Sequence, residues 1–448
     1  MRYLARLAIE FTTPFIIGGG NDLIADDTFV ADANGLPLLP GSSIVGVLRH
    51  EFERLNPGKA ESLFGWQKGK EGSGSRLSVS CGCIHSSSNI PVEGRLHNSR
   101  VQGDPVLRQS LQSIPRDHVR MTDRGTAADN GKFDEKVVPA GNRFTFELML
   151  EGGQEDEAVW KELLNILALP EFRIGGKSRR GFGAFAVKSV VTNRFLLTDK
   201  DDFRKFCNYP VELSKSVEGS ATQLSVTSSS ITATISITPE SFWMFGGGGS
   251  DDKADMNPVK ESRIVWDANG NGQVAPAEFY IPGSSVKGAL SHRTAFHYNG
   301  IKQLFADNID DPASITGEEN QAVKELFGYC KEGDDGRRGS ILISDIYLDT
   351  APPQKVINHV SIDRFTGGAR DGFLFSEQPL YRGKQMKLEL VVANSEGISA
   401  ESRTALGKAL HDLVNGLLPL GAGAGRGNGF FSGSITWSDG GIWIGGAQ

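Results

Sequence analysis

The sequence repeats itself over the length of a whole domain, and this repeat constrains the fold more than any other feature. LPGSSIVGVLRHEF at 39–52 is matched by IPGSSVKGALSHRTAF at 281–296. Further segments follow both boxes in the same order and at nearly the same offset, including HVRMTDR at 118–124 and HVSIDRF at 359–365. One short match would carry little weight, but several matches in constant order indicate a duplicated domain.

The chain of 448 residues is long enough for two or three domains. Each half ends in a glycine-rich loop with an Arg-Gly step, at 173–185 and 421–431, and a strand pattern follows each loop. We predict a first domain over 1–192, a linker over 193–223 and a second domain over 224–448. The linker is placed where the sequence is polar and weakly patterned.

The apolar residues of each half predict both strands and helices. Alternating patterns at 141–150 and 383–392 predict strands, and the patterns at 156–169 and 401–418 predict helices. Each half runs strand, glycine loop, helix, strands, helix, glycine loop, strand, which is typical of a split β-α-β unit. We therefore predict an α+β protein with two tandem ferredoxin-like (RRM-like) domains, each with a hairpin inserted near its middle.

The charge balance excludes a protein that is basic over its whole surface. The formal net charge is -7, so any nucleic-acid binding must come from local basic patches. The four cysteines lack the spacing of a zinc site and indicate a reduced, cytoplasmic setting. The amino terminus predicts a strand rather than a signal peptide, and no segment has the ~18 apolar residues that predict a membrane span.

The PGSS boxes and the terminal glycine loops are the segments that best suit phosphate. A helix amino terminus presents free N–H groups and partial positive charge, and the serines can cap it. Glycine-rich loops form anion-binding concavities, and arginine matches phosphate in two-pronged geometry. The alternative is a capped structural helix and a tight turn with surface arginines. The candidate phosphate contacts are Ser42, Ser43, Arg49, Lys177, Arg179, Arg180, Ser284, Ser285, Lys287 and Arg426.

These boxes and loops, together with HVSIDRFTGGARDGFLF at 359–375, resemble the RAMP superfamily, the repeat-associated mysterious proteins of CRISPR systems. The resemblance covers both halves and is strongest to backbone subunits of type III effector complexes. It implies a protein that binds guide CRISPR RNA and single-stranded target RNA beside other backbone subunits and a large subunit. It also implies a projecting hairpin, or thumb, around 116–140 and 357–382, which wedges between base pairs and flips a nucleotide.

The resemblance gives roles to residues in both thumbs. Two apolar side chains would rest against bases, and two arginines would hold phosphates or the base of the thumb, as suits RNA read by shape and splayed bases. His118 and His359 recur at matching positions and are candidates for RNA contact or acid-base work, with a structural histidine as the alternative. The thumb residues with implied RNA contacts are Met121, Arg124, Ile362 and Arg364.

The resemblance also implies a catalytic aspartate in the loop after the first strand. The matching position in the first domain is Asp26, six residues before Asp32. Its carboxylate would take a proton from a 2′-hydroxyl, or hold Mg²⁺ or another divalent cation near the scissile phosphate. In the longer loop of the second domain the count gives Glu261, while Asp252 and Asp255 lie closer to the glycines. We predict a metal-dependent endoribonuclease, with a non-catalytic RNA-binding scaffold as the alternative.

A second candidate metal site follows in the second domain. DANGNGQVAPAE at 267–278 has the spacing of a twelve-residue calcium loop, with Gly272 at the turn. A strand pattern precedes this segment and Pro276 stands where the next helix would begin, so an Asn-Gly hairpin is the alternative interpretation. The candidate Ca²⁺ ligands are Asp267, Asn269, Asn271 and Glu278.

Overall fold

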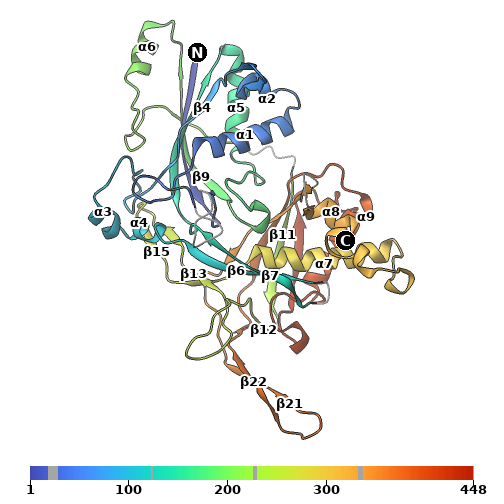
Figure 1. The fold of residues 1–448 in the computed structure, drawn as a ribbon. Coiled ribbons are helices and arrows are strands. Elements are labelled where there is room, and N and C mark those ends of the chain that lie inside the picture. The colour runs from blue at the N-terminus through green and yellow to red at the C-terminus, as the bar shows by residue number, and fades with distance from the viewer. Residues whose placement is uncertain (19–28, 123–124, 226–229, 331–335, 447–448) are drawn as a thin grey trace.

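The two halves of the chain pack against each other, and one hairpin projects from the body (Figure 1). The N-terminal half is blue to green in this view, and the C-terminal half is yellow to red. The structure is a computed structural model that describes residues 1–18, 29–122, 125–225, 230–330 and 336–446.

The first half is built on an antiparallel sheet that is covered by two helices on one face. The helices are α1 (Gly41–Leu55) and α5 (Glu157–Ile166). The neighbouring strands across the sheet are β10 (Ser220–Ala221), β9 (Phe185–Phe195), β1 (Arg2–Phe11), β8 (Arg143–Glu151) and β4 (Leu77–Val79), and β5 (Cys83–Ile84) also pairs with β8.

The second half repeats this plan. Its helices are α7 (Gly283–Ile301) and α9 (Ala400–Val414), which pack against each other and the sheet. In both halves the strand that comes first in the sequence lies in the interior of its sheet, between two later strands. The neighbouring strands across the second sheet are β19 (Ile341–Ile343), β24 (Met386–Val392), β11 (Ile231–Pro239) and β25 (Phe431–Trp437).

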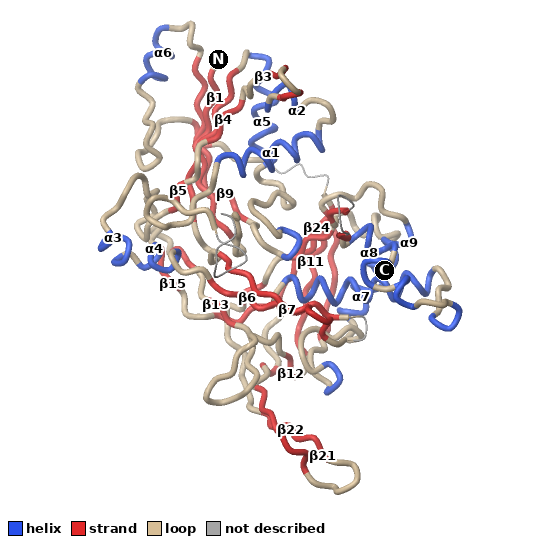
Figure 2. The backbone as a smooth tube through the Cα atoms, viewed as in Figure 1, coloured by secondary structure: helices blue, strands red, loops and turns tan. Residues whose placement is uncertain are grey.

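Shorter helices and strands connect and surround the main elements of both halves (Figure 2). Those of the first half are α2 (Ala60–Phe64), β2 (Trp66–Lys68), β3 (Glu71–Ser73), α3 (Asn98–Gly103), α4 (Pro105–Ser110) and α6 (Lys200–Cys207). Those of the second half are β12 (Phe242–Trp243), β13 (Lys260–Glu261), β14 (Ile264–Trp266), β15 (Gly272–Val274), β16 (Glu278–Ile281), α8 (Gln321–Leu326), β17 (Gly328–Cys330), β18 (Gly336–Arg338), β20 (Ile346–Tyr347) and β23 (Leu380–Tyr381).

Each half has its own hydrophobic core. The larger cluster of the first half joins β1 to α1, where Ile44, Leu48 and Phe52 recur at helical spacing and are buried. The large cluster of the second half likewise joins β11 to α7 and α9. Because these two clusters share no residue, the duplicated sequence corresponds to two domains.

The segment predicted as a linker is ordered structure on the first domain. Strand β9 continues to Phe195, α6 follows, and β10 pairs with β9 as an additional strand. Between them the chain crosses the sheet face opposite the helices. There the buried Arg6 donates hydrogen bonds to the carbonyl oxygens of Pro210, Glu212 and Lys215. The sheet face that an RRM-like protein would offer to RNA is therefore covered by the chain itself at this point.

The helices of the PGSS boxes begin before the serines. Pro40 and Pro282 are the N-cap residues, and a proline side chain has no acceptor for a free N–H group. The serines therefore lie inside the first turn, and the prediction that they cap the helices is wrong. The intervening glycine gives the physical reason. A Cβ on Gly283 would lie 2.5 Å from the carbonyl oxygen of Ile343, so the helix start approaches the strand too closely for a side chain.

This close approach predicts opposite effects for two substitutions in α7. Gly283→Ala is expected to lower the free energy of unfolding by about 1–3 kcal/mol, because the strand backbone must move. Gly288→Ala, in the same helix with nothing within 4 Å of an added Cβ, is expected to be neutral or to stabilise by up to ~1 kcal/mol. Urea denaturation of both variants checks the pair, and equal effects would contradict the close-approach argument.

Candidate nucleic-acid interface

A β-hairpin is inserted before β8 in the first domain and before β24 in the second, close to the ranges expected for the thumbs. The first hairpin is β6 (Ile114–Met121) with β7 (Ala127–Val137), and the second is β21 (Ile357–Ile362) with β22 (Ala369–Glu377). Their registers match, since each places its histidine opposite a phenylalanine and shifts shortly afterwards. The first hairpin lies across the second domain, whereas the second projects away from the body (Figure 1).

The apolar hairpin residues predicted to meet bases are open to a partner. Met121 is 46% exposed and Ile362 is 57% exposed. Arg364 is also exposed, while Arg124 lies outside the described residues. Four further exposed apolar side chains of the second hairpin were not predicted from the sequence: Val360, Phe365, Phe373 and Leu374. The second hairpin therefore presents more apolar surface than the predicted residues alone would suggest.

The glycine loop of the first domain packs onto the second domain. Its short helix η2 (Ser178–Arg180) contacts both α7 and β19. The Nζ of Lys287 donates a 3.0 Å hydrogen bond to the carbonyl oxygen of Arg179, and Arg338 donates one of 2.9 Å to the Ser178 hydroxyl. Two of the predicted phosphate contacts, one from each half of the chain, are thus brought together at the domain junction.

Positive charge at this junction is crowded and partly buried. Burial, together with the charges of Arg179 and Arg180, lowers the pKa of Lys287 to about 8. Burial and the neighbouring Arg338 and Arg173 lower the pKa of Arg179 to about 9. The Nε of Arg179 is buried without a hydrogen-bond partner among the described residues. A phosphate would relieve both the repulsion and the missing hydrogen bond.

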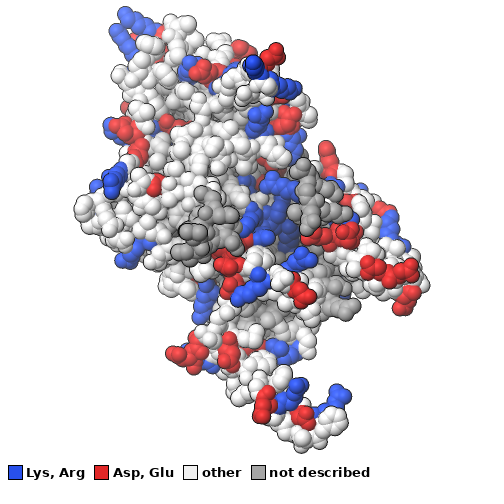
Figure 3. All heavy atoms as spheres, viewed as in Figure 1, with Lys and Arg blue, Asp and Glu red and all other residues white. Residues whose placement is uncertain are grey.

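We call Arg179, Lys287 and Arg338 the cationic junction. Figure 3 shows Lys and Arg side chains gathered between the two domains, with acidic residues beside this patch and elsewhere on the same face. In the part of the chain that the structure describes, none of these three side chains forms an ion pair with a carboxylate. This local patch is how a chain of net charge -7 can attract a polyanion.

The other predicted phosphate contacts occupy different surroundings. Arg49 is exposed on α1, and Ser42 and Ser285 are exposed in the first turns of their helices. Ser43 and Ser284 are partly buried. The remaining three, Lys177, Arg180 and Arg426, belong to the glycine loops and contact buried glutamates of the hairpins.

The four candidate catalytic acids differ in their surroundings. Asp26 lies outside the described residues. Asp252 is exposed, whereas the carboxylate of Asp255 accepts hydrogen bonds from the backbone N–H and the hydroxyl of Ser376. These hydrogen bonds lower the pKa of Asp255. Glu261 is buried and both of its oxygens are bonded, so it is placed to hold structure together rather than to meet RNA.

Glu261 belongs to an interdomain cluster around Arg116, a residue of the first hairpin that sequence analysis missed. The guanidinium of Arg116 donates a 2.7 Å bond to Glu261 and a 2.6 Å bond to Asp345, and it lies 4.6 Å from the Tyr280 ring. Asp345 in turn accepts from the backbone N–H of Gly283 at the start of α7. The internal repeat could not reveal this cluster because the matching hairpin position is an isoleucine.

The candidate calcium loop is a hairpin. Strands β14 and β15 flank it, and the carboxylate of Asp267 accepts from the backbone N–H groups of Asn269 and Asn271. Glu278 lies in β16 and forms an ion pair with Arg263. The carboxylates of Asp267 and Glu278 therefore have other partners, and the side-chain amide of Asn271 donates to Asp267. Within the described residues, no group of three or more His, Cys, Asp or Glu side chains is arranged to hold a metal ion.

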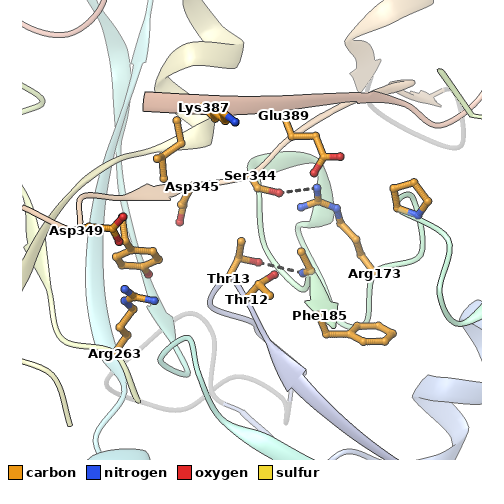
Figure 4. A pocket seen from close by; sticks show the side chains of 14 residues that line it. Thr12, Thr13, Arg173, Phe185, Arg263, Ser344, Asp345, Asp349, Lys387 and Glu389 are labelled. Carbon is orange, nitrogen blue, oxygen red and sulfur yellow. Dashed lines mark hydrogen bonds between the residues drawn. The ribbon is translucent and has the colours of Figure 1, made fainter. Parts of the chain in front are cut away.

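A cavity of about 510 Å³ lies between the domains, next to the Arg116 cluster. Its lining carries side chains of both signs, as Figure 4 shows for Arg173, Lys387, Asp349 and Glu389. Arg173 crosses the junction and donates a 2.9 Å bond to the hydroxyl of Ser344. Because opposite charges are mixed in this lining, the cavity is less suited to a polyanion than the cationic junction.

The chain belongs to the RAMP superfamily. The model of that family matches residues 8–186 and again residues 241–432, so the predicted resemblance and the predicted duplication are both confirmed. These two regions carry the hairpins, the helix boxes and both glycine loops. Among the described residues, no helix is both long enough and apolar enough to span a membrane.

Two individual relatives illustrate the likeness. The CRISPR system Cms endoribonuclease Csm3 of Methanocaldococcus jannaschii is 27% identical over 199 residues, which are 41% of this chain and 77% of the relative. A chain in the cryo-EM structure of the Type III-B Cmr-beta bound to cognate target RNA is 13% identical, with a TM-score of 0.30. That match covers 43% of this chain and 61% of the other.

Proposed function

We propose that this chain is a two-domain backbone subunit of a type III CRISPR effector complex, which holds guide RNA and cleaves complementary target RNA in the cytoplasm. The observation that carries the proposal is the double family match combined with a cationic junction built from both domains. The name of the relative Csm3 supports ribonuclease activity. The partners are guide RNA, single-stranded target RNA, other backbone subunits and a large subunit.

In this proposal each domain is ferredoxin-like and each inserted hairpin is a thumb. The strand and helix order of both halves supports the first point. The exposed Met121 and Ile362 support the second, because an exposed apolar side chain on a hairpin can replace the stacking partner of a base. Two fused domains would then cover two consecutive segments of the guide.

The RNA backbone would lie on the cationic junction. Arg179 and Lys287 face each other across the domain boundary, so a phosphate there is held by both domains at once. Charge-assisted hydrogen bonds of this kind are short and strong, and an arginine can bind two phosphate oxygens together. Guide binding would therefore also strengthen the packing of the two domains.

For cleavage, Asp26 would take the proton of a 2′-hydroxyl. The 2′-oxygen then attacks the adjacent phosphorus, and the bond to the 5′-oxygen of the next nucleotide breaks. A cyclic phosphate is left on one fragment, and the departing 5′-oxygen takes a proton from water. A divalent cation such as Mg²⁺, held by Asp26 or in the second domain by the exposed Asp252, would supply positive charge at that phosphate. Mg²⁺ suits such a site because it is often held by one or two carboxylates and substrate phosphates.

The test is cleavage of labelled target RNA by the assembled guide complex with Mg²⁺, comparing the wild type with Asp26→Ala. We expect the variant to lose one cut position, with a rate at least ~100-fold lower there, while target binding is retained. A cut that remains is then tested with Asp252→Ala. An unchanged pattern in both variants would overturn the catalytic proposal and favour a scaffold that only binds RNA.

A further inference from the structure

Both domains bury a glutamate at the foot of the inserted hairpin. Glu135 lies in β7 and Glu377 lies in β22, and each side chain is only 1% exposed. Two residues before each glutamate lies a phenylalanine, whose ring stacks on the histidine of the opposite strand. The ring centroids are 5.1 Å apart in the first domain and 4.9 Å apart in the second.

In the first domain this glutamate holds the glycine loop. The carboxylate of Glu135 forms ion pairs with Arg180 and, at 2.9 Å, with Lys177. It also lies 3.5 Å from the Nε2 of His118, which belongs to the other strand of the hairpin. The guanidinium of Arg180 covers the Phe133 ring at 4.6 Å. Hairpin and glycine loop are therefore joined by one buried carboxylate.

The second domain repeats this arrangement in detail. One oxygen of Glu377 is 2.9 Å from the Nε2 of His359, and the other accepts a 2.5 Å bond from Arg426. Arg426 again lies over the phenylalanine, 5.7 Å from the Phe375 ring. Asn428 of the same glycine loop approaches the carboxylate as well, at 3.5 Å.

A third segment meets the second hairpin at the same point. The backbone of Met256 accepts from Gln378 and donates to Ser376, which are the residues on either side of Glu377. Asp255 accepts from the hydroxyl of Ser376 at 2.8 Å. The loop that carries the candidate acids Asp252 and Asp255 is thus tied to the hairpin beside the buried glutamate.

Packing alone does not require such a contact. A buried carboxylate loses its hydration, and an apolar side chain of similar size is often as stabilising in the same place. The contact between glutamate and arginine is nevertheless present in both halves, although the chain between the two residues differs in length. The two glutamates are 242 positions apart in the sequence, whereas Arg180 and Arg426 are 246 apart. The shared geometry is therefore specific to the contact and not a consequence of a constant offset.

We propose that Glu135 and Glu377 are positioning residues that fix the RNA-contacting arginine of each glycine loop to the hairpin of the same domain. In the second domain the residues on either side of Glu377 also tie the hairpin to the acid loop. RNA backbone bound at the loop then determines where the hairpin enters the RNA duplex, and hence which bond is presented for cleavage. This inference rests on the proposed function.

The first experiment measures hydrogen exchange of the hairpin amides in the full-length protein, with and without guide RNA. In the wild type, guide binding is expected to slow exchange in β21 and β22 by at least tenfold. Glu377→Gln is expected to abolish this protection while guide affinity changes less than threefold. The control is Glu401→Gln, which removes a solvent-exposed ion pair with Lys302 in the same domain and is expected to keep the protection.

The second experiment maps target cuts by the assembled complex. We expect Glu135→Gln to slow the cut assigned to the first domain about tenfold and to spread it over neighbouring bonds. Glu135→Asp, which keeps the charge on a shorter side chain, is expected to restore a single cut position. A purely structural glutamate would not produce this charge-dependent change of position at unchanged thermal stability.

The outcomes separate the two proposals. If the wild type does not bind guide RNA, the proposed function fails. If guide RNA binds but Glu377→Gln keeps the hairpin protection and Glu135→Gln keeps the cut position, the positioning role is overturned. It is also overturned if both glutamine variants lose guide affinity in proportion to a lowered melting temperature, because the glutamates would then only support folding.

Discussion

Arg116→Ala is expected to lower the free energy of unfolding by about 3–5 kcal/mol, the cost of leaving buried charges without their partner. Arg116 is 5% exposed and lies between Glu261 and Asp345, whose carboxylates come from the other domain. Removing the guanidinium leaves both acids buried beside each other. Protonation or hydration of these two carboxylates requires the domains to separate. The loss of stability therefore appears first at the domain boundary.

The matched control is Arg194→Ala, which removes an arginine from an exposed ion pair with Glu157. Exposed pairs contribute ~0–1 kcal/mol, so this variant should unfold nearly as the wild type does. Urea denaturation followed by tryptophan fluorescence measures both, and Arg116→Ala is expected to add an early transition as the domains part. Equal midpoints for the two variants would show that the Arg116 cluster does not hold the domains together.

The domain plan could be predicted from the sequence because duplication doubles every local signal. A proline-glycine-serine-serine box or a glycine loop seen once is ambiguous, but the same order seen twice indicates the same fold twice. The Arg116 cluster could not be predicted in this way. Its acids lie 145 or more positions away in the other half, and the matching residue of the second hairpin is Ile357. A contact that is made in only one of the two domains produces no repeated pattern in the sequence.

The calcium-loop hypothesis fitted the sequence for a physical reason. Asp267, Asn269 and Asn271 are spaced to ligate a cation, but the same spacing lets an aspartate accept hydrogen bonds from its own following backbone. The turn uses the carboxylate oxygens of Asp267 internally, and Glu278 lies in a strand with Arg263 as its partner. A spacing pattern cannot separate these two uses of a carboxylate, because both need a tight turn with exposed oxygens.

The buried glutamates were missed although the signal was present. The histidines at 118 and 359 were recognised as a repeated pair, and each glutamate also recurs, at 135 and 377. Flanking sequences of the two glutamates differ, so the match is visible only once the strand register places each residue opposite its partner. Side-chain contacts between strands therefore add information that linear motifs do not hold.

The double variant Arg179→Ala/Lys287→Ala is expected to weaken guide-RNA binding about 100-fold near physiological salt. Two charge-assisted hydrogen bonds of at least ~1.5 kcal/mol each account for this loss. Removing two phosphate contacts should also reduce the slope of log affinity against log salt by about 1.4 for a single strand. The control is Arg204→Ala/Lys205→Ala on α6, which removes the same charge from exposed positions.

Lys287 gives the same interface a defined pH dependence. Its pKa in the free protein is lowered to about 8, and a bound phosphate favours the charged form and raises that pKa. Below about pH 8 the ammonium is already charged, so affinity is insensitive to pH. Above that value a proton must be taken up on binding, and affinity falls as pH rises toward the pKa of the complex.

Titration of guide binding between pH 7 and 9 measures this effect in the wild type and in Lys287→Met. The wild type is expected to lose affinity by up to about tenfold per pH unit above pH 8, the limit for uptake of one proton. The methionine variant should bind more weakly at pH 7 and show a flat profile. If the wild-type profile is also flat, or if the α6 control weakens binding as much as the junction variant does, the guide backbone does not lie on the cationic junction.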